Sequence, residues 1–425
     1  MTILSAKVTI FARKNLNELY NMTAIVGVLN KHAVAIAADS AVTLVGGKKV
    51  MNSATKLFAL SKYQPVSIAV YGNAEFIGTP WEIIIKEYRS QLDNRSFPSL
   101  RQYVDDFQKF LRHKKYYCSE KEANDFLRSS VKYLFVNMLK FYTDNPKYFT
   151  SLFHRMNLAK KQPLLGGFKQ DTVDYLNRIV RKEISIGHKA LTNAGIEIEK
   201  DELRKLIEAI YTRDVMPLGS TGLVFSGYGD NEVFPSIYNC SVSGVINGLL
   251  AKVVKCASKI SKSNLSGICP FAQTDVMHTI LDGVAPRMQE IYMQSLEKTF
   301  KKVKESLASI VEETHADLAI KIRELDIAPI GSDFLKMSRA IQIKEYTGPF
   351  VGSVATLEKE DLADFAESLI TLTSLKRKVS FDQETVGGPV DVMVISKGDG
   401  VIWMKKKEYF NSDINPQYFN NYYNL

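Results

Sequence analysis

The sequence predicts a mixed α+β fold, in which strand-rich segments are separated along the chain by long helical ones. Short runs rich in apolar and β-branched residues, each broken by a few polar residues, occupy 23–72, 222–242 and 390–404. Such runs are typical of strands joined by turns. Between them, apolar residues recur at steps of three and four, which is the period of an amphipathic helix. Runs of strands followed by runs of helices indicate the α+β class.

The first segment predicts a hairpin buried on both faces. Two apolar runs, 23–29 and 33–40, are separated by three polar residues, and near-continuous apolar runs are typical of strands without a solvent-facing side. A turn centred on Lys31 places Thr23 directly opposite Asp39, where the side chains of a cross-strand pair can touch. A hydroxyl and a carboxylate would then share one end of a buried ribbon.

A second hairpin is predicted over 55–60 and 66–71, with a turn between the two runs. Lys56 stands near the start of its otherwise apolar first strand, and Gly72 ends the second strand. A helix is expected from about Pro80 to Leu92, because a proline suits the first helical position and apolar residues follow at helical spacing.

These segments resemble the start of proteasome β-type subunits and of the related bacterial HslV-type peptidases. The resemblance is carried by 23–28, 37–40, Lys56 and 72–74. It implies that a free N-terminal threonine is the nucleophile, that an aspartate orients it and that a lysine tunes it. A glycine amide serves as the oxyanion hole in that family.

Transferred residue by residue, the resemblance assigns these roles to Thr23, Asp39, Lys56 and Gly72. Thr23 and Asp39 keep the family spacing, whereas Lys56 and Gly72 come slightly later, after longer turns. Any one of these residues alone would fit an ordinary buried sheet with a satisfied ion pair. The four of them in the family's order favour an active site.

The chemistry requires these residue types. A threonine hydroxyl is a weak nucleophile and needs a base, which in this class is the chain's own α-amino group, with an unperturbed pKa of about 7.7–8.0. A neighbouring ammonium lowers that pKa, and a carboxylate holds the ammonium in place. The backbone N–H of Gly72 could receive the developing oxyanion, a contribution typically of about 2.7–4 kcal/mol.

Thr23 can act in this way only as the first residue of the mature chain. Two origins are considered: synthesis that begins at Met22 with removal of that methionine, or cleavage of a leader. Self-cleaving leaders of the family usually end in glycine, so Met22 favours the alternative start. The segment 1–20 shows no signal-peptide pattern.

The middle of the chain departs from the family and then returns to it. A largely helical stretch over 116–216 is interpreted as an insertion outside the catalytic sandwich. The run 222–238 resembles the family's middle hairpin, and a second helical block is expected over 246–346. The apolar stripe of its longest helix is expected to be core or a subunit interface.

The last segment again resembles the family. The run 349–353 is similar to the glycine-serine strand beside the nucleophile, which makes Ser353 a candidate supporting residue. The run 384–395 is similar to a serine-glycine-glycine turn and the strand after it. Here Val386 takes the place of the family serine, and the aspartate is either moved to Asp382 or replaced near Glu384.

The resemblance implies a four-layer αββα sandwich of the N-terminal nucleophile (Ntn) hydrolase type, with two helical insertions. The sandwich is expected to be built from three separate core segments, 23–115, 217–245 and 347–410. The two helical insertions between them are expected over 116–216 and 246–346. A leader or upstream extension (1–22) precedes the first core segment, and a tail (411–425) follows the last.

Composition narrows the function classes. The chain has 425 residues and a formal charge of +9, with its lysines spread along helices rather than in a nucleic-acid module. No apolar run is long enough to span a bilayer. Four cysteines lack metal spacing, Cys240 is expected to be a buried strand residue, and six histidines form no metal motif. We therefore expect a cytoplasmic protein that binds neither metal nor cofactor, membrane nor nucleic acid.

The expected function is that of a threonine-type peptidase that cleaves polypeptides through an acyl-enzyme on Thr23. Two alternatives stay open: an amidase of small molecules on the same fold, and a catalytically silent subunit that acts in assembly or partner binding. The resemblance also implies a homo-oligomer, possibly supplied by an ATP-dependent unfoldase.

Overall fold

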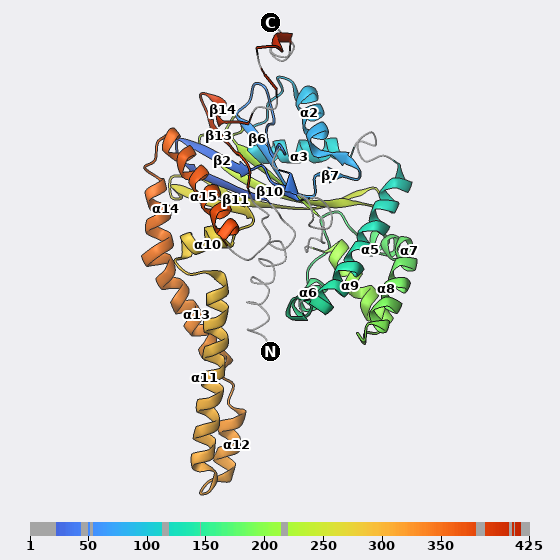
Figure 1. Ribbon diagram of the computed structural model, residues 1–425, viewed down its shortest axis with the longest axis vertical. Helices are drawn as coiled ribbons and strands as arrows, with labels where there is room; N and C mark the ends of the chain where they lie inside the picture. The colour runs from blue at the N-terminus through green and yellow to red at the C-terminus, as the bar shows by residue number, and fades with distance from the viewer. Residues whose placement is uncertain are drawn as a thin grey trace.

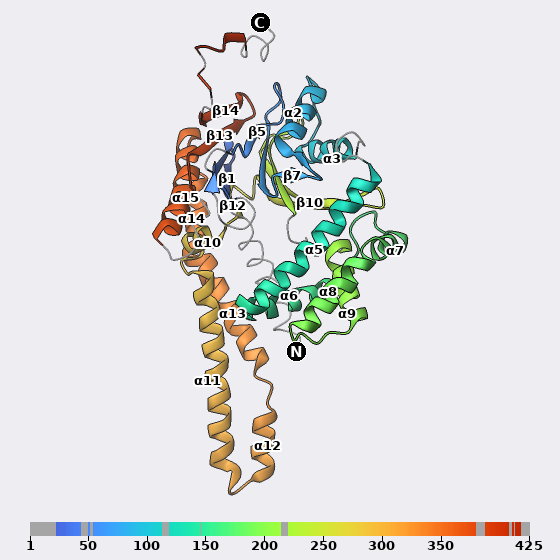
Figure 2. The same ribbon diagram turned by 45° about the vertical axis from the view of Figure 1, so that its right-hand side comes forward.

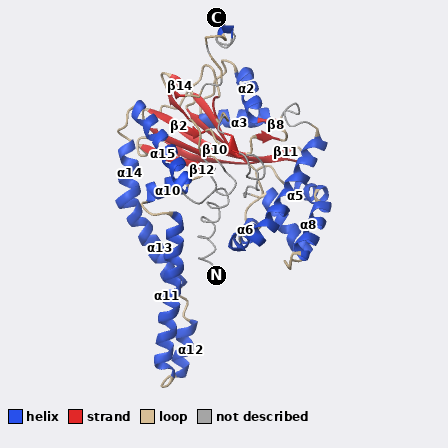
Figure 3. Cartoon of the chain, in the orientation of Figure 1, coloured by secondary structure: helices blue, strands red, loops and turns tan. Residues whose placement is uncertain are grey.

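Two five-stranded antiparallel sheets form the centre of this mixed α+β protein (Figure 1). The computed structural model describes residues 23–43, 50–51, 54–112, 119–144, 146–213, 220–379, 387–407, 410–411 and 413–417. The strands gather in the middle and the helices lie outside them (Figure 3).

The first sheet has the strand order β12-β1-β2-β13-β14, and the second has the order β11-β10-β9-β6-β5. The strands of the first sheet are β1 (Ala24–Asn30), β2 (Ala33–Asp39), β12 (Ser266–Ala272), β13 (Val390–Ser396) and β14 (Gly400–Lys405). Those of the second are β5 (Leu57–Ala59), β6 (Val66–Gly72), β9 (Thr221–Gly227), β10 (Ser236–Ile246) and β11 (Leu249–Lys259). Two small ribbons pair β3 (Val42–Thr43) with β4 (Val50–Met51), and β7 (Glu75–Phe76) with β8 (Thr79–Pro80).

The two sheets pack against each other through one apolar cluster. Ile25 and Ile36 of the first sheet and Leu57, Val224 and Ile237 of the second belong to it, and each is at most 1% exposed. Alternate residues of β1 and β2 point instead to the opposite face, as the two-residue period of a strand requires. The hairpin is therefore buried on both sides, as its apolar runs predict.

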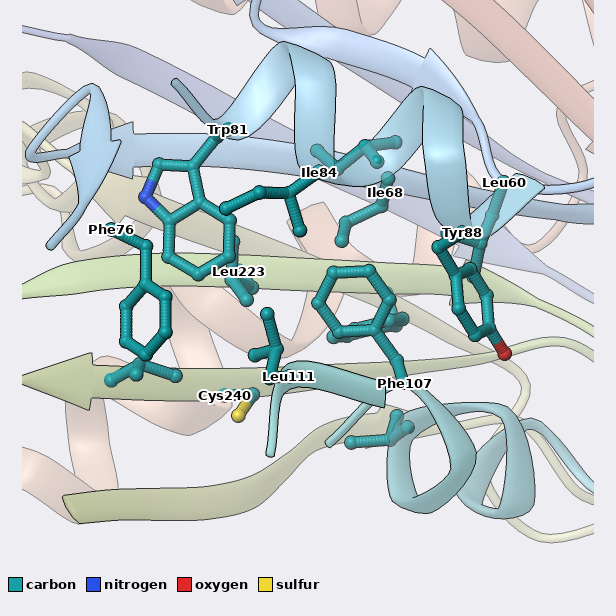
Figure 4. Close-up of a cluster of buried hydrophobic side chains, with 14 of the residues drawn as sticks. Leu60, Ile68, Phe76, Trp81, Ile84, Tyr88, Phe107, Leu111, Leu223 and Cys240 are labelled. Carbon is teal, nitrogen blue, oxygen red and sulfur yellow. The ribbon is translucent and has the colours of Figure 1, made fainter. Parts of the chain in front are cut away.

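Helices α2 (Trp81–Leu92) and α3 (Leu100–Leu111) cover the outer face of the second sheet. The buried stripe of α2 runs from Trp81 to Leu92 at helical spacing. Figure 4 shows Trp81, Ile84 and Tyr88 of this stripe in the apolar cluster that also contains Phe107 of α3. The ring of Phe107 lies 5.5 Å from that of Phe225 on β9. The expected helix at 80–92 is thus confirmed, beginning one residue later than predicted because Pro80 is its N-cap.

The outer face of the first sheet is covered by α15 (Lys359–Val379), with α14 (Gly348–Val354) and α10 (Asp275–Asp282) beside it. Leu362 and Ala366 of α15 pack on the small side chains of the hairpin, among them Ala35 and Ala37. Alanines on this face let a helix approach the sheet closely, which is the physical reason for the alanine-rich composition of β2.

Two helical regions extend from this centre (Figures 1 and 2). The first is a lobe with its own apolar core, which packs on β10 through α5. Its helices are α5 (Glu120–Asp144), α6 (Pro146–Ala159), α7 (Gln170–Ile179), α8 (Arg181–Asn193) and α9 (Lys200–Thr212). The second is a long projecting arm, made of α11 (Pro286–Glu312), α12 (Ala316–Glu324) and α13 (Ala328–Gln342). A π-helical turn, η1 (Ile343–Thr347), leads from the arm into α14.

None of the helices described combines the length and apolar composition that crossing a bilayer requires.

The expected register of the first hairpin is wrong by one residue. Ile25 pairs with Ala38, so that Asp39 comes opposite Ala24 rather than Thr23. The turn is the cause, because the side-chain oxygen of Asn30 accepts hydrogen bonds from the amides of His32 and Ala33 at 2.9 and 3.3 Å. This side-chain-capped turn leaves two residues between the strands.

The expectation of a helical block over 246–346 is also wrong at its start. Strands β11 and β12 occupy 249–259 and 266–272, and helices begin only at Asp275. Asn247 and Gly248 connect β10 to β11 with positive φ angles of 51° and 71°. Asn-Gly is the strongest short-range signal of a tight hairpin turn, and it went unrecognised in the sequence.

Replacement of Gly222 by alanine should destabilise the junction of β6 and β9. Gly222 pairs with Tyr71, and a Cβ there would lie 2.0 Å from the Tyr71 ring. We expect Gly222→Ala to lower the free energy of unfolding by about 1–3 kcal/mol, as overpacking does. Gly352→Ala is the matched control, since a Cβ on that exposed helical glycine meets nothing within 4 Å. Urea unfolding measures both, and equal midpoints would contradict the packing described.

Candidate active site

Asp39 is the centre of a buried polar cluster at one end of the two sheets. Its Oδ1 accepts hydrogen bonds from the amide of Ala24 and from Nζ of Lys56, each at 2.8 Å. Its Oδ2 accepts from the amides of Ala41 and Gly387 at 3.2 and 3.3 Å. The residue is only 1% exposed. Four donors around one carboxylate satisfy the hydrogen-bonding capacity of this buried group.

Lys56 reaches this carboxylate from the other sheet. It directly precedes β5, is 5% exposed, and its Nζ also donates to the carbonyl of Ala41 at 2.5 Å. Burial lowers the pKa of Lys56 below its ordinary value of 10.5, the Asp39 carboxylate opposes this shift, and the nearby Lys407 ammonium adds to it. The ion pair therefore joins the two sheets and keeps a cation whose proton is held less firmly than usual.

Thr23 lies at the start of β1, immediately before the residue whose amide binds Asp39. It is 6% exposed, and its carbonyl accepts a hydrogen bond from the amide of Gln273 at 3.1 Å. Thr23 and Ile25 are two residues apart, so their side chains point to the same face of the strand. The side chain of Ile25 lies between the sheets. Bonds to both neighbouring strands thus fix the backbone at Thr23.

Lys407 and Asp391 form a second ion pair. Nζ of Lys407 donates to Asp391 Oδ2 at 2.5 Å, to Ser40 Oγ at 2.8 Å and to the carbonyl of Ala54 at 2.7 Å. The amide of Lys407 also binds Asp391 Oδ1, at 2.8 Å. These bonds hold the ends of β2, β13 and the segment before Lys56 in one arrangement.

Gly72 ends β6 with a φ angle of 85°. The amide of Val70 donates to the carbonyl of Lys56 at 2.9 Å. Gly72 follows Val70 by two residues, so it lies roughly 7 Å further along the strand. Just beyond it, Thr221 Oγ1 donates to the carbonyl of Asn73 at 3.0 Å and accepts from Trp81 Nε1 at 2.9 Å. These bonds fix the turn that follows Gly72.

Ser353 does not belong to this cluster. The run 349–353, expected as a strand beside the nucleophile, is part of helix α14, and Ser353 is an exposed residue whose Oγ donates to the carbonyl of Phe350 at 2.8 Å. The π-helical turn η1 ends at Thr347 and α14 begins at Gly348, so this segment continues a helix instead of forming a strand. The role assigned to Ser353 is therefore wrong.

The strand that does lie beside Thr23 is β12. At its end, Ala272 has a φ angle of 65°, and the buried Gln273 follows. Arg377 of α15 donates to Gln273 Oε1 at 3.1 Å and to Asp275 Oδ1 at 2.6 Å. The expected auxiliary residues Asp382, Glu384 and Val386 lie outside the described residues.

Asp391, Lys407 and Gln273 are not predicted as site residues from the sequence. Asp391 is a lone acidic residue in an apolar run, whereas Lys407 ends a run of three lysines, a pattern that favours an exposed position. Only the fold shows that Lys407 turns inward. Gln273 carried no signal of its own.

Among the described residues, no group of three or more His, Cys, Asp and Glu side chains could hold a metal ion. A pocket of about 650 Å³ opens in the helical lobe, between Arg128, Arg178, Arg181 and Lys182. Its lining comes from the lobe and contributes nothing to the cluster around Asp39. Cys240 is fully buried in β10, as expected, and burial raises its thiol pKa to about 11, so it is a structural residue.

No protein-family model matches this chain, and no curated protein matches it in sequence.

Removal of the central carboxylate should be strongly destabilising. Asp39→Ala leaves the Lys56 ammonium buried without its counter-charge and deprives the Ala24 amide of its acceptor. We expect a loss of about 3–5 kcal/mol in the free energy of unfolding. Asp364→Ala, at an exposed position of α15, is the control and should be near neutral. Similar denaturant midpoints for the two variants would contradict the importance of the pair.

The depressed pKa of Lys56 should appear in the pH dependence of stability. The folded chain releases this proton at a lower pH than the unfolded chain, so the unfolded state binds more protons between the folded pKa and 10.5. The free energy of unfolding gains a contribution that rises with pH across that window and is lost as pH falls through the folded pKa. Lys56→Met should lack this rise, while Lys86→Met, at an exposed position of α2, should keep it. Urea titrations from pH 7 to 11 compare them, and parallel curves for wild type and Lys56→Met would refute the assignment.

Proposed function

We propose that this chain is a threonine-type N-terminal nucleophile hydrolase that cleaves peptide bonds through an acyl-enzyme on Thr23. The proposal includes the fold, taken as a four-layer αββα Ntn sandwich with the helical lobe and the arm as insertions. It is supported by two facing sheets with helices on both outer faces.

One observation carries the proposal. The carboxylate of Asp39 accepts hydrogen bonds from the amide of Ala24 and the ammonium of Lys56, at 2.8 Å each. Thr23 directly precedes Ala24. A buried lysine with a lowered pKa, held by a specific carboxylate, is typical of functional sites. An ordinary structural ion pair would not require a threonine at this point of the chain.

In the proposed acylation step, the hydroxyl oxygen of Thr23 attacks the carbonyl carbon of the scissile bond. The free α-amine of the same residue takes the hydroxyl proton as general base. The tetrahedral intermediate then collapses, the C–N bond breaks, and the ammonium returns the proton to the leaving amine. An ester between Thr23 and the acyl half of the substrate remains.

Deacylation reverses the roles with water as the nucleophile. The α-amine takes a proton from the water, the hydroxide attacks the ester, and the proton is delivered to the Thr23 oxygen as the carboxylic acid leaves. The Lys56 ammonium, which shares Oδ1 of Asp39 with the amide of Ala24 next to Thr23, would favour the neutral form of the Thr23 amine at working pH. The amide of Gly72 is the proposed donor to the oxyanion of both intermediates.

The natural substrate is proposed to be a polypeptide, and the oligomer and the ATP-dependent unfoldase implied by the resemblance belong to the same proposal. The mechanism itself requires only an amide, so the small-molecule amidase differs in substrate and not in chemistry. The silent subunit differs in its N-terminus, because a blocked amine at Thr23 removes the base.

Thr23→Ala should abolish covalent labelling and hydrolysis while leaving the fold intact. The protein is produced in two forms, one starting at Met1 and one starting at Met22. The intact mass of each purified form identifies its N-terminal residue. An electrophilic probe that bonds to hydroxyl and amine together should label Thr23, and cleavage of fluorogenic peptides should fall by at least about 10³-fold in Thr23→Ala. Thr192→Ala, at an exposed position of α8, should behave as wild type.

Each alternative predicts a different result. Undiminished labelling or cleavage in Thr23→Ala would disprove the mechanism. Turnover of small amides without any peptide cleavage would favour the amidase. Absence of both labelling and cleavage in a chain whose N-terminus is Thr23 would favour the silent subunit.

A further inference from the structure

The projecting arm exposes its apolar side chains to solvent. Apolar residues that are at least 45% exposed occur on all three arm helices, whereas monomeric proteins rarely leave apolar patches larger than a few hundred Å² uncovered. Those on α11 are Tyr292, Val303, Leu307 and Ile310, those on α12 are Leu318 and Ile320, and those on α13 are Ile330, Phe334, Met337 and Ile341.

Helix α13 is inverted with respect to an ordinary surface helix. Its exposed stripe consists of Ile330, Phe334, Met337 and Ile341, which are 45%, 45%, 67% and 58% exposed. Its other side is made mostly of small and polar residues, with the half-buried Leu335 among them: Ser332 is buried, and a Cβ on Gly331 would lie 3.9 Å from Met293 of α11. A helix normally turns its apolar stripe to the core. Here that stripe faces away from the chain's own arm.

The stripe has the spacing of a coiled-coil seam. Its four residues, which we call the α13 seam, follow one another at steps of four, three and four. This is the alternation of a and d positions that lets side chains of one helix enter the gaps of another. The seam therefore fits a helix that is not part of this chain's own arm.

Charge favours an identical arm as the partner. Residues 286–342 contain nine Lys and Arg against nine Asp and Glu, so the arm is neutral although the chain carries +9. A neutral arm neither attracts a strongly acidic partner nor repels its own copy. The residues beside the seam are Gly331, Ser338 and Ala340, with Asp333 as the one charged residue among them. An antiparallel pairing would place Asp333 opposite Ser338 and Ala340 of the second copy, so no like charges would meet there.

The arm is large enough for a stable interface. A standard protein interface takes about 20–30 residues a side, and α11 alone has 27 residues and α13 another 15. A twofold pairing uses the same patch on both subunits. Antiparallel α13 helices would place Phe334 against Met337 of the second copy, and Ile330 against Ile341.

From this surface we propose that two copies of the chain associate through their arms, with the α13 seam at the centre of the interface. This proposal is independent of the chemistry at Thr23. Side chains buried in the centre of an interface carry most of its affinity. The seam should therefore control association and leave the fold of each subunit unchanged.

Sedimentation velocity of the full chain tests this association. At concentrations on the order of 10 μM the wild type should sediment as a dimer or a larger assembly built from it. The double variant Phe334→Glu, Met337→Glu should sediment at least one association step lower, with the circular dichroism spectrum of the wild type. The double variant Val136→Glu, Ile186→Glu is the matched control, since both positions are at least 55% exposed on the lobe, and it should retain the wild-type assembly.

A wild type that stays monomeric at every concentration would overturn the proposal and leave the seam to a different partner. An assembly that survives the seam variant would place the interface elsewhere and overturn it equally. Dissociation by the lobe variant alone would assign the contact to the lobe. Loss of the assembly in the seam variant alone supports the proposal.

Discussion

The ion pair between Asp39 and Lys56 is the interaction on which the arrangement of this protein depends. It joins two sheets whose facing sides pack through apolar side chains. Apolar contacts hold the sheets together but are not directional. They therefore do not fix the position of one sheet relative to the other. A hydrogen-bonded carboxylate with donors from β1, from Lys56 and from the start of the last strand segment specifies one alignment.

Burial of this ion pair costs free energy, which the surrounding hydrogen bonds offset. A buried ion pair loses the hydration of both charges, and its attraction compensates only when the remaining hydrogen-bonding capacity is also satisfied. Here every oxygen of the carboxylate has at least two donors. The Lys407–Asp391 pair supports the same strand ends and adds a second positive charge near Lys56. The result is a polar cluster held in one geometry, with a lysine whose proton is weakly held.

The two helical regions relate differently to this centre. The lobe formed by α5–α9 buries a core of its own and rests on β10. The arm formed by α11–α13 buries little, with only Pro286 and Ala308 fully inside among the residues of α11. A region that buries so little within its own chain gains its stability from helix–helix contact along its length and, on our proposal, from a second copy.

Local pattern determined much of this protein. The apolar runs located the strands of both early hairpins and of β9, β13 and β14 to within a few residues. The helical period located α2 and the two helical stretches that contain α5–α9 and α11–α13. The order of Thr23, Asp39, Lys56 and Gly72 also suggested a site before any geometry was known. Periodicity reports which side of an element is buried, and α2 is buried on the side that its pattern predicts. The apolar residues that recur along α11 are exposed instead, among them Tyr292, Leu307 and Ile310.

Two turns with local causes were not predicted: a side-chain-capped turn at Asn30 set the hairpin register, and an Asn-Gly turn directed β11 back along β10. Tertiary structure alone decided the rest. The placement of β12, rather than 349–353, beside Thr23 depended on which segments pair across more than two hundred residues of chain. Long-range pairing of this kind leaves no local periodic signal. For the same reason Lys407 and Gln273 could be assigned to the cluster, and Ser353 removed from it, only once the strands were in place.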